Sequence, residues 1–245
     1  MTQVFTPGTV YGVGLGPGCQ DLMSVRADRL IRGATHIAYF RKKGRKGHAR
    51  SIVEGLLAPG VVEMPMEYPV TTEIPFDDPR YNALLSTFYS RCVAQLIEIS
   101  EAGGDVVVLC EGDPFFYGSF MHLYTRLLNR VPVSVVPGIT GMSAAWTATG
   151  QPITWGDDVL TVLMATLPEA QLAEHIAQTD ALVVMKIGRN LDKLRRALVH
   201  TGREVDAWLI EYAAMTNQRV IPFSEVEESV PYFSIVLIHG NGRRP

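Results

Sequence analysis

The sequence predicts an α/β protein with two domains, and three features support this. In the first half, apolar strand-like runs alternate with helical patterns, which is typical of a mostly parallel sheet with helices on both faces. In the second half, the last three strand-like runs follow one another without helices, which indicates a mixed sheet. The length of 245 residues allows one large α/β unit or two domains of ordinary size, and a hydrophobic fraction of 47% is ample for a core. We expect an N-terminal α/β domain over residues 1–137 and a C-terminal α/β domain over 138–245.

The elements of the first half follow from the spacing of apolar residues. Asp21 is the expected N-cap of the first helix, and Gly103 and Gly104 end the long third helix. The Pro- and Thr-rich segment 69–79 is too long for a simple connector, and such loops are usually functional. The expected strands are 10–15, 35–40, 61–66, 105–110 and a fifth from residue 133, and the expected helices are 21–32, 49–57, 80–102 and 119–129.

The second half begins near Gly138 and shows fewer helices than strands. The expected strands are 160–165, 182–186, 207–212, 218–221 and 233–238, and the expected helices are 142–148, 169–178 and 191–201.

One segment organises the first half: residues 111–118, Glu-Gly-Asp-Pro-Phe-Phe-Tyr-Gly, directly after the apolar strand 105–110. The segments 10–18 and 133–141 have the same form, a strand that ends in glycine and proline. Ligands of open α/β sheets bind at the carboxyl ends of the strands. Glycine-rich turns there leave backbone N–H groups free and allow a polar small molecule to approach closely.

The loop 12–18 does not match known nucleotide fingerprints. G-x-G-x-x-G requires a third glycine where the chain has Pro17 or, in the other frame, Cys19. The acidic residue expected about 20 residues later to hold a ribose is also missing, and no glycine loop is followed by Gly-Lys-Ser/Thr. A tight turn without a ligand is the alternative for this loop taken alone.

Other chemistries find little support in the sequence. The six histidines show no metal-ligand spacing and no Gly-x-Ser-x-Gly is present, so we expect no metal site and no covalent nucleophile. The three cysteines form no C-x-x-C pair, which favours a reducing cytoplasm. The net charge of −3 gives no drive toward nucleic acid, and no apolar run has membrane-spanning length.

Two groups of charged residues each leave two interpretations open. Asp113 could accept hydrogen bonds from ligand hydroxyls, or it could cap the helix that follows Pro114, and Glu111 could face a cation. The second group is a basic run directly after the second strand; it is either a solvated loop or a binding surface for a polyanion. Its members are Arg41, Lys42, Lys43, Arg45, Lys46, His48 and Arg50.

Three motifs together resemble the tetrapyrrole methyltransferases that use S-adenosylmethionine. They are a first strand ending in G-x-G-P-G, then Gly-Asp-Pro-x-x-Tyr-Gly, then Val-x-Val-x-Pro-Gly-Ile-Thr, in this order. The strand ends 184–186 and 211–213 extend the resemblance over nearly the whole chain. Within the family, the loop 41–45 and the segment 68–73 resemble the branch that methylates carbon-20 of precorrin-2, or of its cobalt-containing counterpart, in cobalamin synthesis.

The resemblance implies a homodimer, with S-adenosylmethionine in the cleft between the two domains and a tetrapyrrole as substrate. Relatives often carry Ala or Ser where this chain has Gly141. The implied cofactor residues are Pro17, Glu111, Gly112, Asp113, Phe116, Thr140, Gly141, Met185, Tyr212, Ala213 and Gly240. The implied substrate residues are Arg41, Lys42, Lys43, Arg45, Thr71, Thr72 and Glu73.

The predicted reaction gives precorrin-3A and needs positioning more than a strong base. The leaving thioether is neutral and the meso carbon is already nucleophilic, so no catalytic acid or base is assigned. The cobalt-containing substrate, another tetrapyrrole position, a protein histidine or an RNA ribose remain as alternatives. A regulatory module that binds a nucleotide without catalysis is the alternative outside enzymes.

Overall fold

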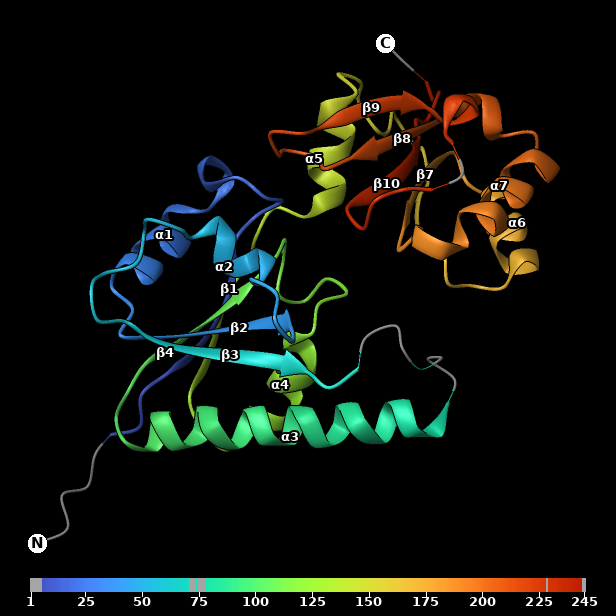
Figure 1. Cartoon of the computed structure of the whole chain (residues 1–245). Coiled ribbons are helices and arrows are strands. Elements are labelled where there is room, and N and C mark those ends of the chain that lie inside the picture. The colour runs from blue at the N-terminus through green and yellow to red at the C-terminus, as the bar shows by residue number, and fades with distance from the viewer. Residues whose placement is uncertain (1–5, 71–73, 75–77, 228, 244–245) are drawn as a thin grey trace, which may run out of the picture. The chain divides into compact units, whose positions relative to one another are not determined.

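The computed structural model describes residues 6–70, 74, 78–227 and 229–243. The chain divides into two compact units, Met1–Thr140 and Gly141–Pro245, each built around its own five-stranded sheet (Figure 1). The division lies close to the boundary expected after residue 137.

The sheet of the first unit is entirely parallel, with the strand order β3-β2-β4-β1-β5. Every residue of the central strand β4 is buried, as its unbroken apolar run predicts. The strands are β1 (Val10–Gly14), β2 (His36–Lys42), β3 (Val62–Tyr68), β4 (Val106–Cys110) and β5 (Val133–Val136).

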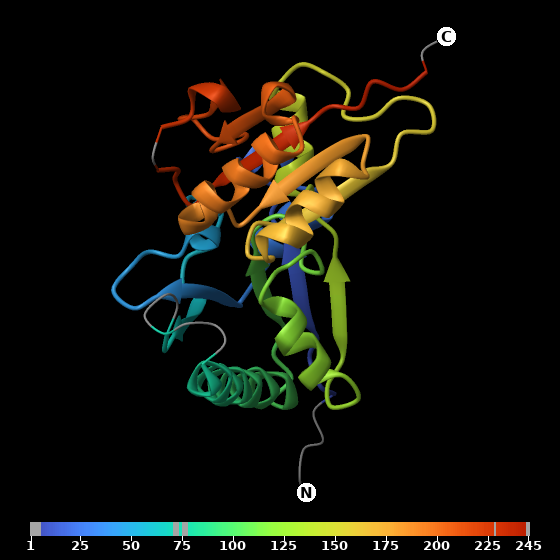
Figure 2. The same ribbon diagram turned by 90° about the vertical axis from the view of Figure 1, so that its right-hand side faces the viewer.

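Helices cover both faces of this sheet. The long helix α3 (Pro79–Glu101) and α4 (Phe120–Leu127) pack together over one face, as the two views in Figures 1 and 2 show. Residues of α1 (Val25–Arg32) and α2 (His48–Ile52) belong to a second buried cluster on the other face. Successive strand residues such as Val107 and Val108 point to opposite faces and join different clusters.

The first helix begins later than its sequence predicts. Asp21 lies in a short 3-10 turn, η1 (Gln20–Leu22), and is not the N-cap of α1. Ser24 occupies that position instead, and its Oγ accepts a hydrogen bond from the Ala27 amide at 3.1 Å. The buried pair Ala27 and Ile31, four residues apart, fixes the face that α1 turns to the core.

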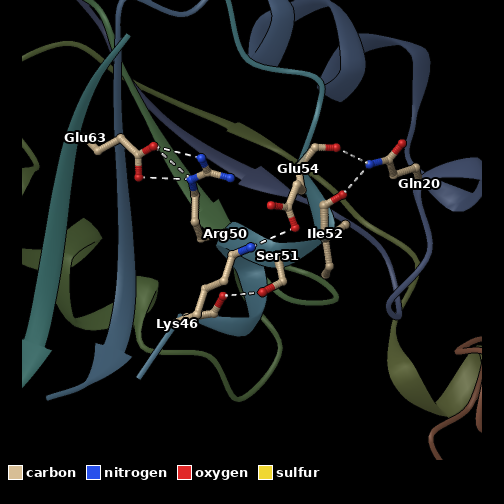
Figure 3. Close-up of polar contacts among 8 residues, drawn as sticks. Gln20, Lys46, Arg50, Ser51, Ile52, Glu54 and Glu63 are labelled. Atoms are coloured by element: carbon tan, nitrogen blue, oxygen red, sulfur yellow. Dashed lines mark hydrogen bonds and ion pairs between the residues drawn. The ribbon is translucent and has the colours of Figure 1, made fainter. Parts of the chain in front are cut away.

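The edge strand β3 is held to its neighbours by charge pairs. Pro65, which has no N–H to donate, is tolerated because β3 has a partner on one side only. The Nε atom of Arg50, a residue of α2, donates to both carboxylate oxygens of Glu63, at 2.9 and 3.0 Å (Figure 3). The Tyr39 hydroxyl donates to the same carboxylate at 2.9 Å. These contacts connect β2, β3 and α2.

The pKa of Glu63 is lowered by its hydrogen bonds with Arg50, while burial opposes that shift and Tyr39 adds to it. A lowered carboxyl pKa contributes stability above the unfolded value of about 4.3, and this contribution is lost as the pH falls through the folded value. We therefore expect Glu63→Gln to lower the thermal midpoint most at neutral pH, with a difference from the parent that shrinks toward pH 3. Thermal unfolding from pH 3 to pH 7 measures this. Glu54→Gln is the control, since Glu54 belongs to an exposed pair with Lys46. A difference in thermal midpoint between Glu63→Gln and the parent that did not change with pH would contradict the assignment.

The second unit has the expected mixed sheet, in the order β6-β7-β10-β8-β9. β6 and β7 are parallel, and the pairs β7–β10, β10–β8 and β8–β9 are antiparallel. The strands are β6 (Leu160–Met164), β7 (Ala181–Met185), β8 (Ala207–Glu211), β9 (Arg219–Pro222) and β10 (Ser234–Ile238).

Helices lie on both faces of this sheet as well. Helices α6 (Glu169–Ala177) and α7 (Leu191–His200) share one buried cluster with the sheet, and α5 (Gly141–Ala148) contributes to a second one. Three short 3-10 turns complete the unit: η2 (Gly188–Asn190), η3 (Glu204–Asp206) and η4 (Phe223–Glu225). Among the described residues, no helix is both long and apolar enough to cross a membrane.

Candidate functional site

The loops that follow β1 and β4 are joined backbone to backbone. Gly16 and Gly112 form an isolated antiparallel bridge, in which the Gly112 amide donates to the Gly16 carbonyl at 2.8 Å and the reverse bond measures 3.3 Å. Gly112 has a φ of 62°, a conformation that glycine adopts at no steric cost. Pro17 comes directly after this bridge and is buried. The predicted cofactor residues Pro17 and Gly112 thus lie in two loops that are tied together.

The loop after β5 packs against the same point. A Cβ atom added to Gly138 would lie 2.0 Å from the Gly112 carbonyl oxygen and 2.9 Å from the Gly14 Cα. A Cβ on Gly14 would lie 2.6 Å from the Gly138 nitrogen. Three strand-end loops therefore meet with no room for a side chain between them. This is the side-chain-poor junction that the three glycine segments predict.

Asp113 joins two of these loops through its carboxylate. Oδ1 accepts a hydrogen bond from the Phe115 amide at 2.8 Å, and Oδ2 accepts one from the Gly138 amide at 3.0 Å. The helix-capping interpretation is wrong, because the residues after Pro114 form a turn and α4 starts only at Phe120. Each carboxylate oxygen keeps further acceptor capacity for a ligand.

Glu111 has an exposed side chain at the carboxyl end of β4. Its Oε1 accepts a hydrogen bond from the Ala49 amide at 3.1 Å, in the first turn of α2. The loop after β1 is tied to the other end of this helix, because Gln20 Nε2 donates to the carbonyls of Ile52 at 2.7 Å and of Glu54 at 3.0 Å (Figure 3). Helix α2 therefore holds the loops after β1 and β4.

Left-handed backbone angles are concentrated beside predicted cofactor residues. Tyr117, Lys186, Tyr212 and Ala214 have φ between 51° and 61°, which non-glycine residues rarely adopt. They adjoin Phe116, Met185 and Ala213, and Tyr212 is itself a predicted cofactor residue. Such conformations cost free energy and are found preferentially at functional sites. The one other case among the described residues, Asn129, follows the end of α4.

In the second unit, Met185 ends β7, and Tyr212 and Ala213 follow β8. The two strands run parallel on either side of β10, so their carboxyl ends lie at the same edge of the sheet. Gly240 lies at the opposite edge, because β10 is antiparallel to both neighbours and pairs Ile238 with the starts of those strands. Gly240 therefore does not share the edge of Met185, Tyr212 and Ala213, and its contact with the cofactor stays a prediction. Its lack of a side chain is explained locally.

The local explanation for Gly240 is its packing on a neighbouring carboxylate. A Cβ atom there would lie 2.0 Å from Asp158 Oδ2, which accepts a hydrogen bond from the Trp155 amide at 2.8 Å. Gly141 differs, since a Cβ on it would meet only Ile235 Cδ1 at 3.6 Å, an ordinary contact. The Ala or Ser expected from the resemblance would therefore fit at Gly141. Thr140, the last residue of the first unit, follows the Gly138 loop.

The basic run 41–50, which covers the end of β2, the turn after it and the start of α2, contains two kinds of cation. Arg41 pairs with Glu67 at 2.7 Å, Lys46 with Glu54 at 2.7 Å and Arg50 with Glu63 at 2.8 Å; the last two pairs are drawn in Figure 3. Lys42, Lys43 and Arg45 are exposed, and no described carboxylate forms an ion pair with them. Three of the four predicted basic substrate residues thus have no carboxylate partner within the described part of the chain. Thr71, Thr72 and Glu73 lie outside the described residues.

A group of three hydroxyls close to this edge is absent from the sequence predictions. The Tyr68 and Tyr89 hydroxyls both contact the Ser119 Oγ, the second at 3.3 Å. These residues come from β3, α3 and the start of α4, so no spacing along the chain indicates that they meet. The serine directly before α4 is the one available signal. Within the described ranges, no group of three or more His, Cys, Asp or Glu side chains could hold a metal ion.

These features define a two-unit α/β protein whose glycine loops gather at the carboxyl edge of a parallel sheet. Residues 9–227 match the family model described as Tetrapyrrole (Corrin/Porphyrin) Methylases, and the chain belongs to this family. The family resemblance indicated by the sequence motifs is therefore confirmed.

Two of the named relatives are C(20)-methyltransferases, and a third is a cobalamin biosynthesis protein. The chain is 48% identical to the Precorrin-2 C(20)-methyltransferase of Sinorhizobium sp, over 97% of this chain and 98% of the relative. It is 43% identical to the Cobalamin biosynthesis protein CobIJ of Mycobacterium tuberculosis, over 97% of this chain and 47% of that longer protein. It is 28% identical to the Cobalt-precorrin-2 C(20)-methyltransferase of Salmonella typhimurium, over 95% of this chain and 96% of the relative.

Solved structures show the same fold at lower identity. Cobalt precorrin-4 methyltransferase superposes with a TM-score of 0.73 at 18% identity, over 94% of each chain. Uroporphyrin-III C-methyltransferase from Thermus thermophilus, solved in complex with S-adenosylhomocysteine, gives a TM-score of 0.68 at 23% identity, over 95% of this chain and 92% of that chain. The predicted α/β fold class is confirmed.

Proposed function

We propose that this chain transfers a methyl group from S-adenosylmethionine to carbon-20 of precorrin-2, giving precorrin-3A. The observation that carries the proposal is the 48% identity, over nearly the full length of both chains, to the Sinorhizobium enzyme named for that reaction. The free cations Lys42, Lys43 and Arg45 support it, because precorrin-2 carries many carboxylates.

The proposed cofactor residues fall into two groups, one in each unit. Two observations support this assignment: several of these residues lie beside strained backbone, and the glycine junction is crowded. Strained backbone costs free energy and is concentrated at functional sites. In the first unit they are Pro17, Glu111, Gly112, Asp113, Phe116 and Thr140, and in the second Gly141, Met185, Tyr212, Ala213 and Gly240.

In the proposed reaction, the bond between the methyl carbon and the sulfonium sulfur breaks as the bond to carbon-20 forms. The sulfur leaves as a neutral thioether, and the proton on carbon-20 is released to solvent. S-adenosylmethionine supplies the methyl group when bound. The contribution of the chain is to hold the reacting atoms in line and to exclude water, which can supply a large part of such a barrier.

Parallel incubations with precorrin-2 and with its cobalt-containing counterpart, using labelled S-adenosylmethionine, test the proposal. We expect label at carbon-20 of the metal-free substrate. The reason is that the chain is more similar to the Sinorhizobium enzyme, named for precorrin-2, than to the Salmonella enzyme, named for cobalt-precorrin-2. Faster labelling of the cobalt substrate would support the alternative substrate. Binding of S-adenosylhomocysteine without transfer to any tetrapyrrole would support the regulatory module instead.

We also propose a homodimer, from the family resemblance, and a cytoplasmic location, from the cysteine pattern. Sedimentation equilibrium tests the first, and a monomer at micromolar concentration would contradict it. Fractionation of the source cells tests the second.

A further inference from the structure

Ser119 directly precedes α4 but does not cap it. Serine at this position usually accepts a hydrogen bond from an amide in the first turn of the helix, from an extended backbone. Here Ser119 has helical backbone angles, φ −71° and ψ −18°, and its side chain makes no capping bond. Its hydroxyl is turned instead toward the hydroxyls of Tyr68 and Tyr89. The Ser119 hydroxyl therefore makes tertiary contacts with the two tyrosines in place of a hydrogen bond to the first turn of α4.

Aromatic contacts hold both tyrosines in place. The Tyr89 side chain, in α3, is 5% exposed, and its ring lies 4.7 Å from that of His122 with the Arg126 guanidinium 5.7 Å from its centroid. The Tyr68 ring stacks on Phe40 with centroids 5.4 Å apart. The three hydroxyls therefore meet at a fixed, partly buried point between β3, α3 and α4.

This point lies between the two parts of the first unit's site. Tyr68 is the last residue of β3 and is the register partner of Lys42, one of the free cations. Phe40, on which Tyr68 stacks, belongs to the same strand as Lys42. On the other side, Ser119 directly follows Gly118, where the Gly-Asp-Pro loop ends.

We propose that Ser119 is a positioning residue: through its hydrogen bond with Tyr68 it holds the end of β3, and with it the paired end of β2 that carries Lys42, at a fixed distance from the loop 111–118. The inference rests on the proposed function, in which Lys42 faces the tetrapyrrole and the loop faces S-adenosylmethionine. Ser119 itself contacts neither ligand. It sets the place of the substrate relative to the cofactor.

Steady-state kinetics test the link in the full chain, with the variants Ser119→Ala, Tyr68→Phe and Ser119→Thr. We expect the first two to raise the KM for precorrin-2 about threefold while the Kd for S-adenosylmethionine stays within about twofold, which is the effect of losing a hydrogen bond of ordinary strength. Ser119→Thr keeps the hydroxyl and should restore the parent KM. The Tyr68→Phe and Ser119→Ala double variant should be no worse than either single one.

Ser90→Ala, an exposed serine on α3, is the matched control and should leave both constants unchanged. An unchanged KM in Ser119→Ala, or an equal loss for both ligands that threonine fails to restore, would overturn the inference.

Hydrogen exchange of the ligand-free protein gives a readout that does not depend on methyl transfer. In Ser119→Ala we expect faster amide exchange in peptides that cover residues 112–118 and the end of β3, and unchanged exchange in α7. Equal exchange in the parent and the variant would overturn the inference whatever the substrate is. A parent that shows the link by exchange yet methylates no tetrapyrrole would instead overturn the proposed function alone.

Discussion

A Gly138→Ala variant is expected to lose detectable binding of S-adenosylhomocysteine, a fall in affinity of more than about a hundredfold. The added Cβ would lie 2.0 Å from the Gly112 carbonyl oxygen, far inside any tolerated contact, and the clashing atom belongs to backbone. Relief requires the loops after β4 and β5 to separate, which would also break the 3.0 Å bond from the Gly138 amide to Asp113. A hundredfold loss corresponds to about 2.7 kcal/mol, within reach of such a disruption. Isothermal titration calorimetry measures it.

Gly118→Ala is the matched control, because it makes the same substitution at the end of the Gly-Asp-Pro loop. A Cβ there would meet only the carbonyl oxygens of Pro114 and Asp113, at 3.6 and 3.7 Å, so binding should stay near the parent value. Asp113→Ala reaches the same junction without adding an atom, and losing its bonds should weaken binding by roughly ten- to a hundredfold. Normal binding by folded Gly138→Ala would show that this junction is no part of the cofactor site.

The sequence predicted the parallel sheet and the loops at its edge because those features depend on local patterns. The apolar run 106–110 and the Gly-Asp-Pro turn behind it identify a buried strand and its exit by themselves. The sequence pattern places the cap of α1 at Asp21, whereas Ser24 occupies that position; both residue types cap helices, and a short 3-10 turn separates the two. Local signals therefore give the element and leave its first residue open.

Features that depend on tertiary pairing could not be predicted in this way. The position of Gly240 depends on β10 running antiparallel between β7 and β8, and the residues of β10 do not indicate in which direction the strand runs. The charge state of the basic loop depends on Glu63 and Glu67, which reach it only through the register of β2 with β3. In the sequence these cations form one group, and the structure divides them into cations that pair with a described carboxylate and cations that do not.

That division makes the basic loop testable with little change to the fold. Replacing Lys42 and Lys43 together by Gln is expected to raise the KM for precorrin-2 about tenfold at low salt, because each exposed charge facing a carboxylate contributes up to about 1 kcal/mol. The Kd for S-adenosylmethionine should not change, since the proposed cofactor residues lie on other loops. Raising the ionic strength to about 0.5 M should reduce the difference, because salt screens exposed charges over less than about 10 Å. Steady-state kinetics at two salt concentrations, with each ligand varied separately, measures all three effects.

The matched control removes two exposed arginines elsewhere in the first unit, Arg29 and Arg130. Arg29 lines a cleft of about 370 Å³ with residues that precede β2 and β4, and Arg130 precedes β5, so both lie toward the amino ends of the strands. The Arg29→Gln and Arg130→Gln pair changes the net charge by the same amount as the lysine pair. If long-range attraction by net charge were responsible, both pairs would raise the KM equally. If Lys42 and Lys43 contact the substrate, only the lysine double variant will raise the KM. Equal KM values for the lysine variant and the parent at low salt would remove the loop from the substrate site.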